Sequence, residues 1–285
     1  MKLKIHKKVN RSLGGSIVIF ILLFLVGVFM FLPFVYAIMQ SLKPMEEIYA
    51  FPPRFFVVNP TIESYQLLGT LTDSMWVPFS RYLLNTILVT IFGTVFNLLF
   101  ASMAAFPLAK FKFPGYKIIF KIVESSLLFA GPVTALPLYI VISKLGLVDT
   151  LWSIILPAMG APLGLFLMKN FMGQISDAML EAARIDGAGM FRIFHTIVMP
   201  LVKPAMFTLI IFSFQSLWNT TGGTYIYEEE WKLLPTIMNQ ITTSGIARVG
   251  VTAASGVVMM IPPFVLFIAL QSRIIETMAF SGIKG

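Results

Sequence analysis

The sequence predicts an all-α integral membrane protein with six transmembrane helices. Hydrophobic residues make up 57% of its 285 residues, charged residues only 12%, and the mean hydropathy is +0.86, whereas an ordinary soluble domain carries about 25% charged residues. Several apolar runs are long enough to cross a hydrocarbon core of about 30 Å. Lysine and arginine also concentrate in alternate connecting segments, as the positive-inside rule requires.

The first span is predicted at residues 17–39, after a basic tail at residues 1–15 that is expected to lie in the cytoplasm. A signal peptide also begins with positive charge, but its apolar core is only about 7–15 residues long. This apolar run is longer, so we interpret it as an uncleaved transmembrane helix.

Two more spans are predicted after a polar segment at residues 40–80, whose proline pairs indicate turns. The second span covers residues 83–107 and contains Asn85 and Asn97, which should face protein or a water-filled path because lipid cannot satisfy them. The third covers residues 118–142. Its Lys121 and Glu124 either pair or reach the interface. Two prolines in this run, Pro132 and Pro137, should bend the helix.

The last three spans are predicted at residues 151–168, 204–218 and 251–270. A polar segment, residues 169–203, precedes the fifth span, which is short and needs extra turns from its flanks. The segment at residues 219–250 follows it. We expect Pro262-Pro263 to break the sixth span.

Charge distribution predicts the orientation. Fifteen of the 21 lysines and arginines fall in the N-terminal tail, the 110–121 segment, the 169–203 segment and the C-terminal end. The positive-inside rule places these in the cytoplasm, with both termini, and places segments 40–80 and 219–250 outside. The same distribution explains the net charge of +8 by topology and attraction to anionic lipid, so we do not expect nucleic-acid binding.

Catalytic chemistry is not predicted for this chain. It has no cysteine and only two histidines, which are far apart in sequence, so thiolate chemistry and a histidine metal cluster are not expected. It also lacks the glycine-rich phosphate loop ending in Gly-Lys-Ser/Thr that cradles ATP. We therefore predict no catalytic residue, no metal and no bound cofactor. Uphill transport would need a partner chain or an ion gradient.

The 169–203 segment carries strong helix signals. Ser176 stands at an N-cap position, residues 177–186 are good helix formers, and Gly187 follows where a left-handed C-terminal cap belongs. Glu181 and Arg184 have the spacing of a surface pair. A second short helix should stop near Pro200. Taken alone, this pattern is also typical of an amphipathic connector at a membrane face.

The same segment resembles the cytoplasmic loop of binding-protein-dependent ABC importer permeases. The shared pattern is Glu-Ala-Ala, three residues, Gly, nine residues, then Ile-x-Leu-Pro; in this chain it falls on Glu181, Ala182, Ala183, Gly187, Ile197 and Pro200, with Met199 in the Leu position. In that family the loop forms a coupling helix that docks on the ATPase subunit. The resemblance implies the type I ABC importer permease fold over residues 16–285.

The resemblance also implies roles and partners. The residues expected to couple to the ATPase are Glu181, Ala182, Ala183, Arg184, Asp186 and Gly187. The partners would be a second homologous permease, two ATPase subunits that bind ATP and Mg²⁺, and an extracytoplasmic sugar-binding protein. The chain would lie in the bacterial cell membrane as a non-catalytic subunit that forms half of the translocation pathway.

Shorter segments, including Arg81 to Thr86, Trp218-Asn219 and Gly282 to Gly285, resemble carbohydrate importers related to the smaller permease subunit of the maltose transporter. In that system the loop matching residues 219–250 enters the binding protein. The resemblance therefore suggests binding-protein contacts at Gly222, Gly223, Tyr225, Tyr227 and Trp231. An aromatic belt at the membrane interface explains the same aromatics equally well.

Two other functions stay open at this point. An ABC importer for a non-sugar solute would share the 169–203 pattern. An ion-coupled secondary carrier would need a mid-membrane coupling site, for which Glu124 is the candidate. The sequence does not identify the sugar, the partner chains or the number of membranes in the envelope, and it assigns no sugar ligand to this chain.

Overall fold

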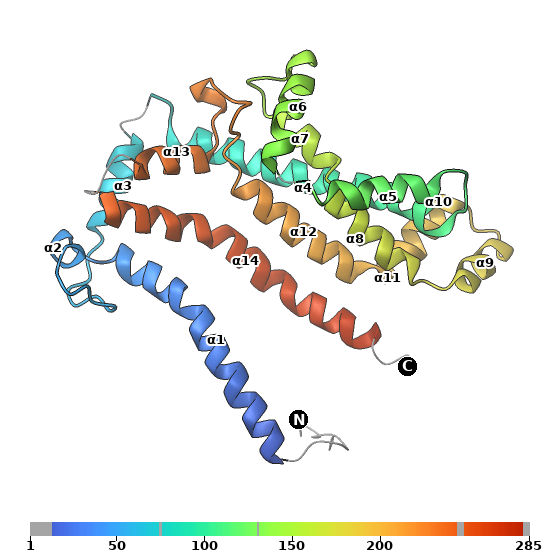
Figure 1. Cartoon of the computed structure of the whole chain (residues 1–285), viewed down its shortest axis with the longest axis horizontal. Coiled ribbons are helices and arrows are strands. Elements are labelled where there is room, and N and C mark those ends of the chain that lie inside the picture. Colours follow the sequence, from blue (N-terminus) through green and yellow to red (C-terminus); the bar gives the residue numbers. More distant parts are fainter. Residues whose placement is uncertain (1–12, 74–75, 130, 244–247, 282–285) are drawn as a thin grey trace. The chain divides into compact units, whose positions relative to one another are not determined.

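The computed structural model describes residues 13–73, 76–129, 131–243 and 248–281 (Figure 1). Much of the predicted basic tail and the closing Gly282 to Gly285 lie outside these residues. The regular elements in the described part are all helical, which confirms the predicted class. They are α1 Leu13–Ser41, α2 Met45–Ile48, α3 Glu63–Asp73, α4 Phe79–Lys110, α5 Tyr116–Ser126, α6 Gly131–Lys144, α7 Trp152–Met159, α8 Pro162–Gly173, α9 Asp177–Ile185, α10 Met190–Ile193, the π-helical turn η1 Phe194–Val198, α11 Met199–Leu201, α12 Lys203–Trp218, the 3₁₀ turn η2 Glu229–Trp231, α13 Leu234–Thr242 and α14 Val249–Ser281.

The chain divides into two compact units, and unit 1 comprises residues 1–69 and 245–258. Two charged side chains, Lys43 and Glu47, form hydrogen bonds that hold the polar segment after α1 together. Lys43 is buried and donates to Gln40 Oε1 at 2.9 Å. Glu47 accepts the backbone N–H groups of Val58 and Asn59 at 3.0 and 2.8 Å. The bond from Val58 is the main reason that the pKa of the Glu47 carboxyl is lowered.

Unit 2 comprises residues 70–244 and 259–285 and is built around α4. This helix packs against α7, α8 and α12 (Figure 1). Glycines allow the close approach. A Cβ atom on Gly164 of α8 would lie 2.5 Å from Asn97 Oδ1, and one on Gly93 would lie 2.6 Å from Leu217 Cδ1 of α12. Small residues at such crossings are typical of helix packing in membranes, where backbones approach closely.

Four helical stretches in the described residues are long and apolar enough to cross a membrane: Gly14–Ser41, Phe79–Lys110, Trp152–Gly173 and Val249–Ser272. The number rises to six if each of two bent helix pairs counts as one span. These pairs are Tyr116–Ser126 with Gly131–Lys144, and Met190–Leu201 with Lys203–Trp218. The six predicted spans correspond to these six stretches.

Prolines lie close to the break in both bent pairs. In the third span the helix ends at Ser126 and resumes at Gly131, so that Pro132 stands in the first turn of α6, where a missing N–H is tolerated. Pro137 lies inside α6. The fifth predicted span is short here too, since α12 has 16 residues, and the turns before it, Met190–Leu201, are bent by 77° relative to α12. Pro204 contributes to this turn, since it has no N–H with which to continue the hydrogen-bond ladder.

The expectation that Pro262-Pro263 breaks the last span is also wrong, since α14 runs through both prolines. Pro263 lacks the N–H that would bond to the Met259 carbonyl four residues earlier. The indole of Trp218 replaces it, because Trp218 Nε1 donates to Met259 O at 2.9 Å. An unsatisfied carbonyl is costly inside a membrane, so this bond from α12 allows the prolines to stay within one helix.

We predict that Trp218→Phe destabilises the protein by about 1–3 kcal/mol, the usual cost of leaving a buried carbonyl without a donor. The measurement is the midpoint of thermal unfolding of the detergent-solubilised protein. Trp76→Phe is the matched control, because the Trp76 side chain is 94% exposed. Equal midpoints for both variants would contradict the role of this hydrogen bond.

Candidate functional site

The predicted helix in the 169–203 loop is α9, and it presents most of its side chains to solvent. Glu181, Ala182, Arg184 and Asp186 are exposed, whereas Leu180 is buried. Ser176 has the extended backbone of an N-cap, but its side chain makes no capping hydrogen bond. The helix therefore lies on the protein with one apolar side chain inserted and a polar surface left free.

Gly187 ends this helix in the predicted left-handed conformation, with φ of +81°. The Gly187 N–H donates to Arg184 O and the Ala188 N–H to Ala183 O, both at 2.9 Å. These two bonds form a Schellman cap, which satisfies carbonyls at the helix end. Only glycine adopts this φ without a steric penalty from Cβ, so Gly187 fixes the direction in which the chain leaves α9.

The loop rests on a hydrophobic core in unit 2. Leu180 from α9, Ile193 from α10 and Val198 from η1 are buried in a cluster with apolar side chains of α4, α8 and α12. Ala183 also packs against this cluster. Of the two alanines predicted to face an ATPase, therefore, Ala182 is exposed and Ala183 is turned toward the protein's own core.

Lys110 ties α9 to the C-terminal end of α4, a contact that sequence reasoning missed. Its side chain is 5% exposed, and Nζ lies 2.8 Å from Asp177 Oδ1 and also donates to Ile175 O. The hydrogen bond and charge of Lys110 lower the pKa of the Asp177 carboxyl. The interaction thus supports the fold at neutral pH and is lost only when the pH falls through this lowered pKa. Lys110 and Asp177 are 67 positions apart in sequence, so no local sequence pattern predicts that they form an ion pair.

The expected pair of Glu181 with Arg184 is not formed, since the ion pairs within the described ranges are Lys110–Asp177 and Lys232–Glu229. Lys121 and Glu124 do not pair there either. The Arg184 guanidinium lies over the Phe111 ring instead, 5.6 Å from its centroid. This leaves the Glu181 carboxylate without an ion-pair partner on the exposed surface of α9.

The second helix of the loop runs from Met190 to Leu201 and contains a π-helical turn, η1. Within it the Met199 N–H donates to Phe194 O, five residues earlier. The next residue is Pro200, which has no N–H and whose ring clashes with the carbonyl four residues before it. The wider turn accommodates this proline, and the helix ends one residue after the predicted position.

The 219–250 loop is organised by Asp149, which sequence reasoning also missed. Asp149 has a positive φ of 57°, a conformation that aspartate tolerates better than most residues. Its N–H donates to Tyr225 O at 2.9 Å, and its Oδ1 accepts the N–H groups of Tyr227 and Glu228 at 2.5 and 2.9 Å. One residue of the α6–α7 connection therefore holds the tip of this loop.

The rest of the same loop is anchored on the N-terminal end of α4. Asn85 donates to Glu230 O at 2.8 Å, Tyr82 OH donates to Glu229 Oε1 at 3.0 Å, and Thr86 Oγ1 accepts the Leu234 N–H at 2.8 Å. Asn85 is 1% exposed and Asn97 4%. Both asparagines face protein, as predicted.

The five residues predicted to contact a binding protein differ in exposure. Gly222 is buried, Tyr225 stacks on Tyr139 at 6.4 Å, and Trp231 lies under the Arg81 guanidinium at 5.2 Å. Gly223 and Tyr227 are exposed. The neighbouring hydroxyl of Tyr139 raises the pKa of Tyr227. These two residues are the ones available to a partner at the tip.

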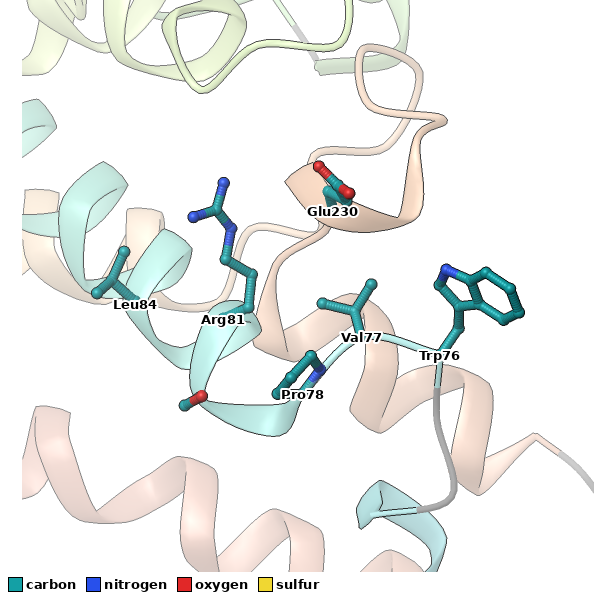
Figure 2. A pocket seen from close by; sticks show the side chains of 7 residues that line it. Trp76, Val77, Pro78, Arg81, Leu84 and Glu230 are labelled. Carbon is teal, nitrogen blue, oxygen red and sulfur yellow. The ribbon is translucent and has the colours of Figure 1, made fainter.

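An open pocket of about 580 Å³ lies beside this anchor and is lined by Glu230 and by residues between Trp76 and Leu84. Figure 2 shows its lining side chains. Arg81 and Glu230 bring charges of both signs to it. The indole of Trp76, almost fully exposed, projects at its edge. The pocket is therefore polar and aromatic.

The exposed, capped helix α9 thus lies between two of the helical stretches that can cross a membrane. A family comparison defines the class of the protein. Residues 67–278 match the family described as "Binding-protein-dependent transport system inner membrane component". The chain belongs to this family, and it is a multi-pass inner membrane protein and the non-catalytic permease of an ABC importer.

Curated relatives match over most of their length. Protein LplC of Bacillus subtilis is 30% identical over 303 aligned positions, covering 99% of both chains. The melibiose/raffinose/stachyose import permease protein MelC of the same species is 33% identical over 207 positions, covering 71% of this chain and 75% of MelC.

The fold matches a solved structure described as a bacterial ABC transporter involved in the import of the acidic polysaccharide alginate. The TM-score is 0.75 at 24% identity, covering 93% of this chain and 99% of the other. At this identity the match concerns the fold, and it confirms the predicted ABC importer permease architecture.

We predict that Lys110→Met loosens α9, because it removes both the ion pair to Asp177 and the bond to Ile175 O. The measurement is hydrogen–deuterium exchange of the amides of residues 177–186 in the full chain. Exchange should become faster in this variant. Lys117→Met, which removes an exposed lysine a few residues away, should leave it unchanged; equal exchange in the two variants would contradict the anchoring role.

Proposed function

We propose that this chain is a permease subunit of an ATP-driven importer of sugars or oligosaccharides and forms half of the translocation pathway. Family membership supports the transport class. The names of relatives support the solute class, since they include permeases for melibiose, raffinose and stachyose, for polygalacturonan and rhamnogalacturonan, and for arabinooligosaccharides. The observation that carries the coupling mechanism is the exposed surface of α9, fixed at both ends.

The complex would contain a second, homologous permease, two ATPase subunits that bind ATP and Mg²⁺, and an extracytoplasmic sugar-binding protein. One solved relative is described in complex with an alginate pentasaccharide-bound periplasmic protein. The charge distribution supports an orientation with both termini and the 169–203 loop in the cytoplasm. The 219–250 loop would then face the binding protein.

Coupling requires a surface that transmits force from the ATPase into the spans. Glu181, Ala182, Arg184 and Asp186 would contact the ATPase, because they are exposed on α9. Ala183 and Gly187 would not contact the ATPase themselves. Ala183 would hold α9 against the hydrophobic core, and Gly187 would fix the direction in which the chain leaves α9. Lys110 would carry displacement of α9 into α4.

The apolar side chains around α9 support the same assignment. Ile185 is 86% exposed and Phe191 is 80% exposed. Apolar side chains this exposed next to charged ones are typical of a protein interaction surface. Nucleotide-driven closure of the ATPase pair would move this surface and open the permease pair toward the binding protein.

We predict that Gly187→Pro uncouples transport from ATP hydrolysis in the assembled transporter. Proline requires φ near −65°, whereas this position has φ of +81°, so the exit from α9 must change. The measurement is sugar uptake and ATPase activity in proteoliposomes. Gly189→Ala is the control, because Gly189 has φ of −66° and open space around it. Coupled transport by Gly187→Pro would contradict the role of the turn.

Charge reversal at Glu181 tests the contact surface itself. Glu181→Lys should lower uptake and binding-protein-stimulated ATPase activity together while the chain still inserts in the membrane, because the exposed carboxylate would no longer match the ATPase. Glu63→Lys, a charge reversal at an exposed site in α3, should have little effect. Normal uptake by Glu181→Lys would refute the docking assignment.

We predict that Tyr227→Ala weakens stimulation of the ATPase by the binding protein, whereas Tyr227→Phe does not. The ring of Tyr227 is 58% exposed, and its hydroxyl donates to Thr224 O within the loop. The pair of variants therefore separates the aromatic surface from the internal hydrogen bond. The measurement is ATPase activity against binding-protein concentration. Full stimulation of Tyr227→Ala would favour a membrane-anchor role for the loop aromatics.

A further inference from the structure

Two opposite charges flank the open pocket at the start of α4. Arg81 belongs to the first turn of this helix and Glu230 to η2, and both exposed side chains line the pocket (Figure 2). Neither of them takes part in an ion pair within the ranges that the structure describes. The pocket therefore offers one cation and one anion to a molecule that carries both charges.

Both charged side chains stand on parts of the chain that are held in place. The Arg81 guanidinium rests on the Trp231 ring, 5.2 Å from its centroid. The buried side chain of Asn85 donates to Glu230 O at 2.8 Å and to Lys232 O at 3.1 Å. Because these contacts fix η2 against α4 before any ligand arrives, less ordering is required on binding.

The pocket lies at the level of the lipid headgroups. The 32 residues of α4 span about 48 Å, whereas a bilayer is about 30 Å thick in its hydrocarbon core and about 40–45 Å thick with its headgroups. The first turn of α4, which contains Arg81, therefore extends past the hydrocarbon core. Trp76 lines the pocket and is 94% exposed, as is typical of an aromatic side chain at the membrane interface.

An apolar stripe on α4 begins at this pocket. Leu84 lines the pocket and is 48% exposed, and Ile91 and Val95 are 50% and 45% exposed. These three residues share one helix face, because an α-helix turns once every 3.6 residues. Such a stripe within a span suits an acyl chain, whereas a soluble protein outside the membrane cannot reach it. A phospholipid fits both parts, with its headgroup in the pocket and a chain along the stripe.

The geometry points to a binding site for phosphatidylethanolamine. Its phosphate lies against the Arg81 guanidinium, whose fork of N–H groups matches phosphate oxygens. The ammonium group of the same headgroup donates to the Glu230 carboxylate. Phosphatidylglycerol has no cation for Glu230, and the trimethylammonium group of phosphatidylcholine has no N–H to donate. The site goes beyond the proposed function, since it depends neither on the solute nor on the ATPase.

Native mass spectrometry of the full chain tests the headgroup preference. The detergent-solubilised protein is incubated with equal amounts of phosphatidylethanolamine and phosphatidylcholine that carry the same acyl chains, and the retained lipid is measured. Phosphatidylethanolamine should be retained about 3- to 10-fold more than phosphatidylcholine, the effect of one charge-assisted hydrogen bond. Equal retention of the two lipids would overturn the proposal.

Variants without charge test the two contacts. Glu230→Gln should abolish the preference, because an amide does not attract the ammonium group by charge. Arg81→Gln should lower the retention of both lipids about 3- to 10-fold. Glu228→Gln is the matched control and should keep the preference, because Glu228 is exposed on the same loop but does not line the pocket. A preference that survives Glu230→Gln, or that Glu228→Gln removes equally, would contradict the site.

Thermal unfolding in vesicles separates a lipid site from a docking site for the binding protein. Vesicles of phosphatidylcholine are prepared with and without phosphatidylethanolamine. The added lipid should raise the unfolding midpoint of the wild-type chain and of Glu228→Gln but not of Glu230→Gln, because a ligand of the native state stabilises it. A midpoint that responds to the binding protein through Glu230 and not to phosphatidylethanolamine would overturn the proposal.

Discussion

Buried hydrogen-bonding groups on α4 are the constraint on which the rest of unit 2 depends. Inside a bilayer no water is available to satisfy a side-chain amide or ammonium group, so a group that its own helix does not satisfy is stabilised by a partner from another segment. Asn85 donates to the 219–250 loop, Asn97 donates to Ser213 on α12, and Lys110 donates to Asp177 at the start of α9. These partners lie between 67 and 145 positions away in sequence.

The two candidate functional loops are therefore attached to opposite ends of one rigid element. A helix of 32 residues spans about 48 Å at 1.5 Å per residue. Its first turns hold the 219–250 loop through Tyr82, Asn85 and Thr86, and its last residue holds α9 through Lys110. Tilting of α4 would move both attachments at once, so the two loops share a common mechanical part without contact between them.

Local patterns were enough to predict the spans and the turn at Gly187. Apolar length and the left-handed preference of glycine act within a few residues, so the sequence displays them directly. Lys110, Asp149 and the Trp218–Met259 bond could not be predicted, because each joins segments whose meeting depends on the packed fold. Pro263 combines a local and a distant effect. Its own sequence context predicts a helix break, whereas the hydrogen bond from the distant indole of Trp218 explains why α14 continues.

The Glu181 surface and the buried contacts of Asn97 show the same distinction. A motif indicates the Glu181 surface, because its residues are consecutive in sequence. The contacts of Asn97 join α4 to Ser213 of α12 and place Asn97 Oδ1 against Gly164 of α8, and each of these residue types is common in membrane helices for packing alone. Asn97 Oδ1 is buried and has no hydrogen-bond partner among the described residues, and that property exists only once the neighbours are in place.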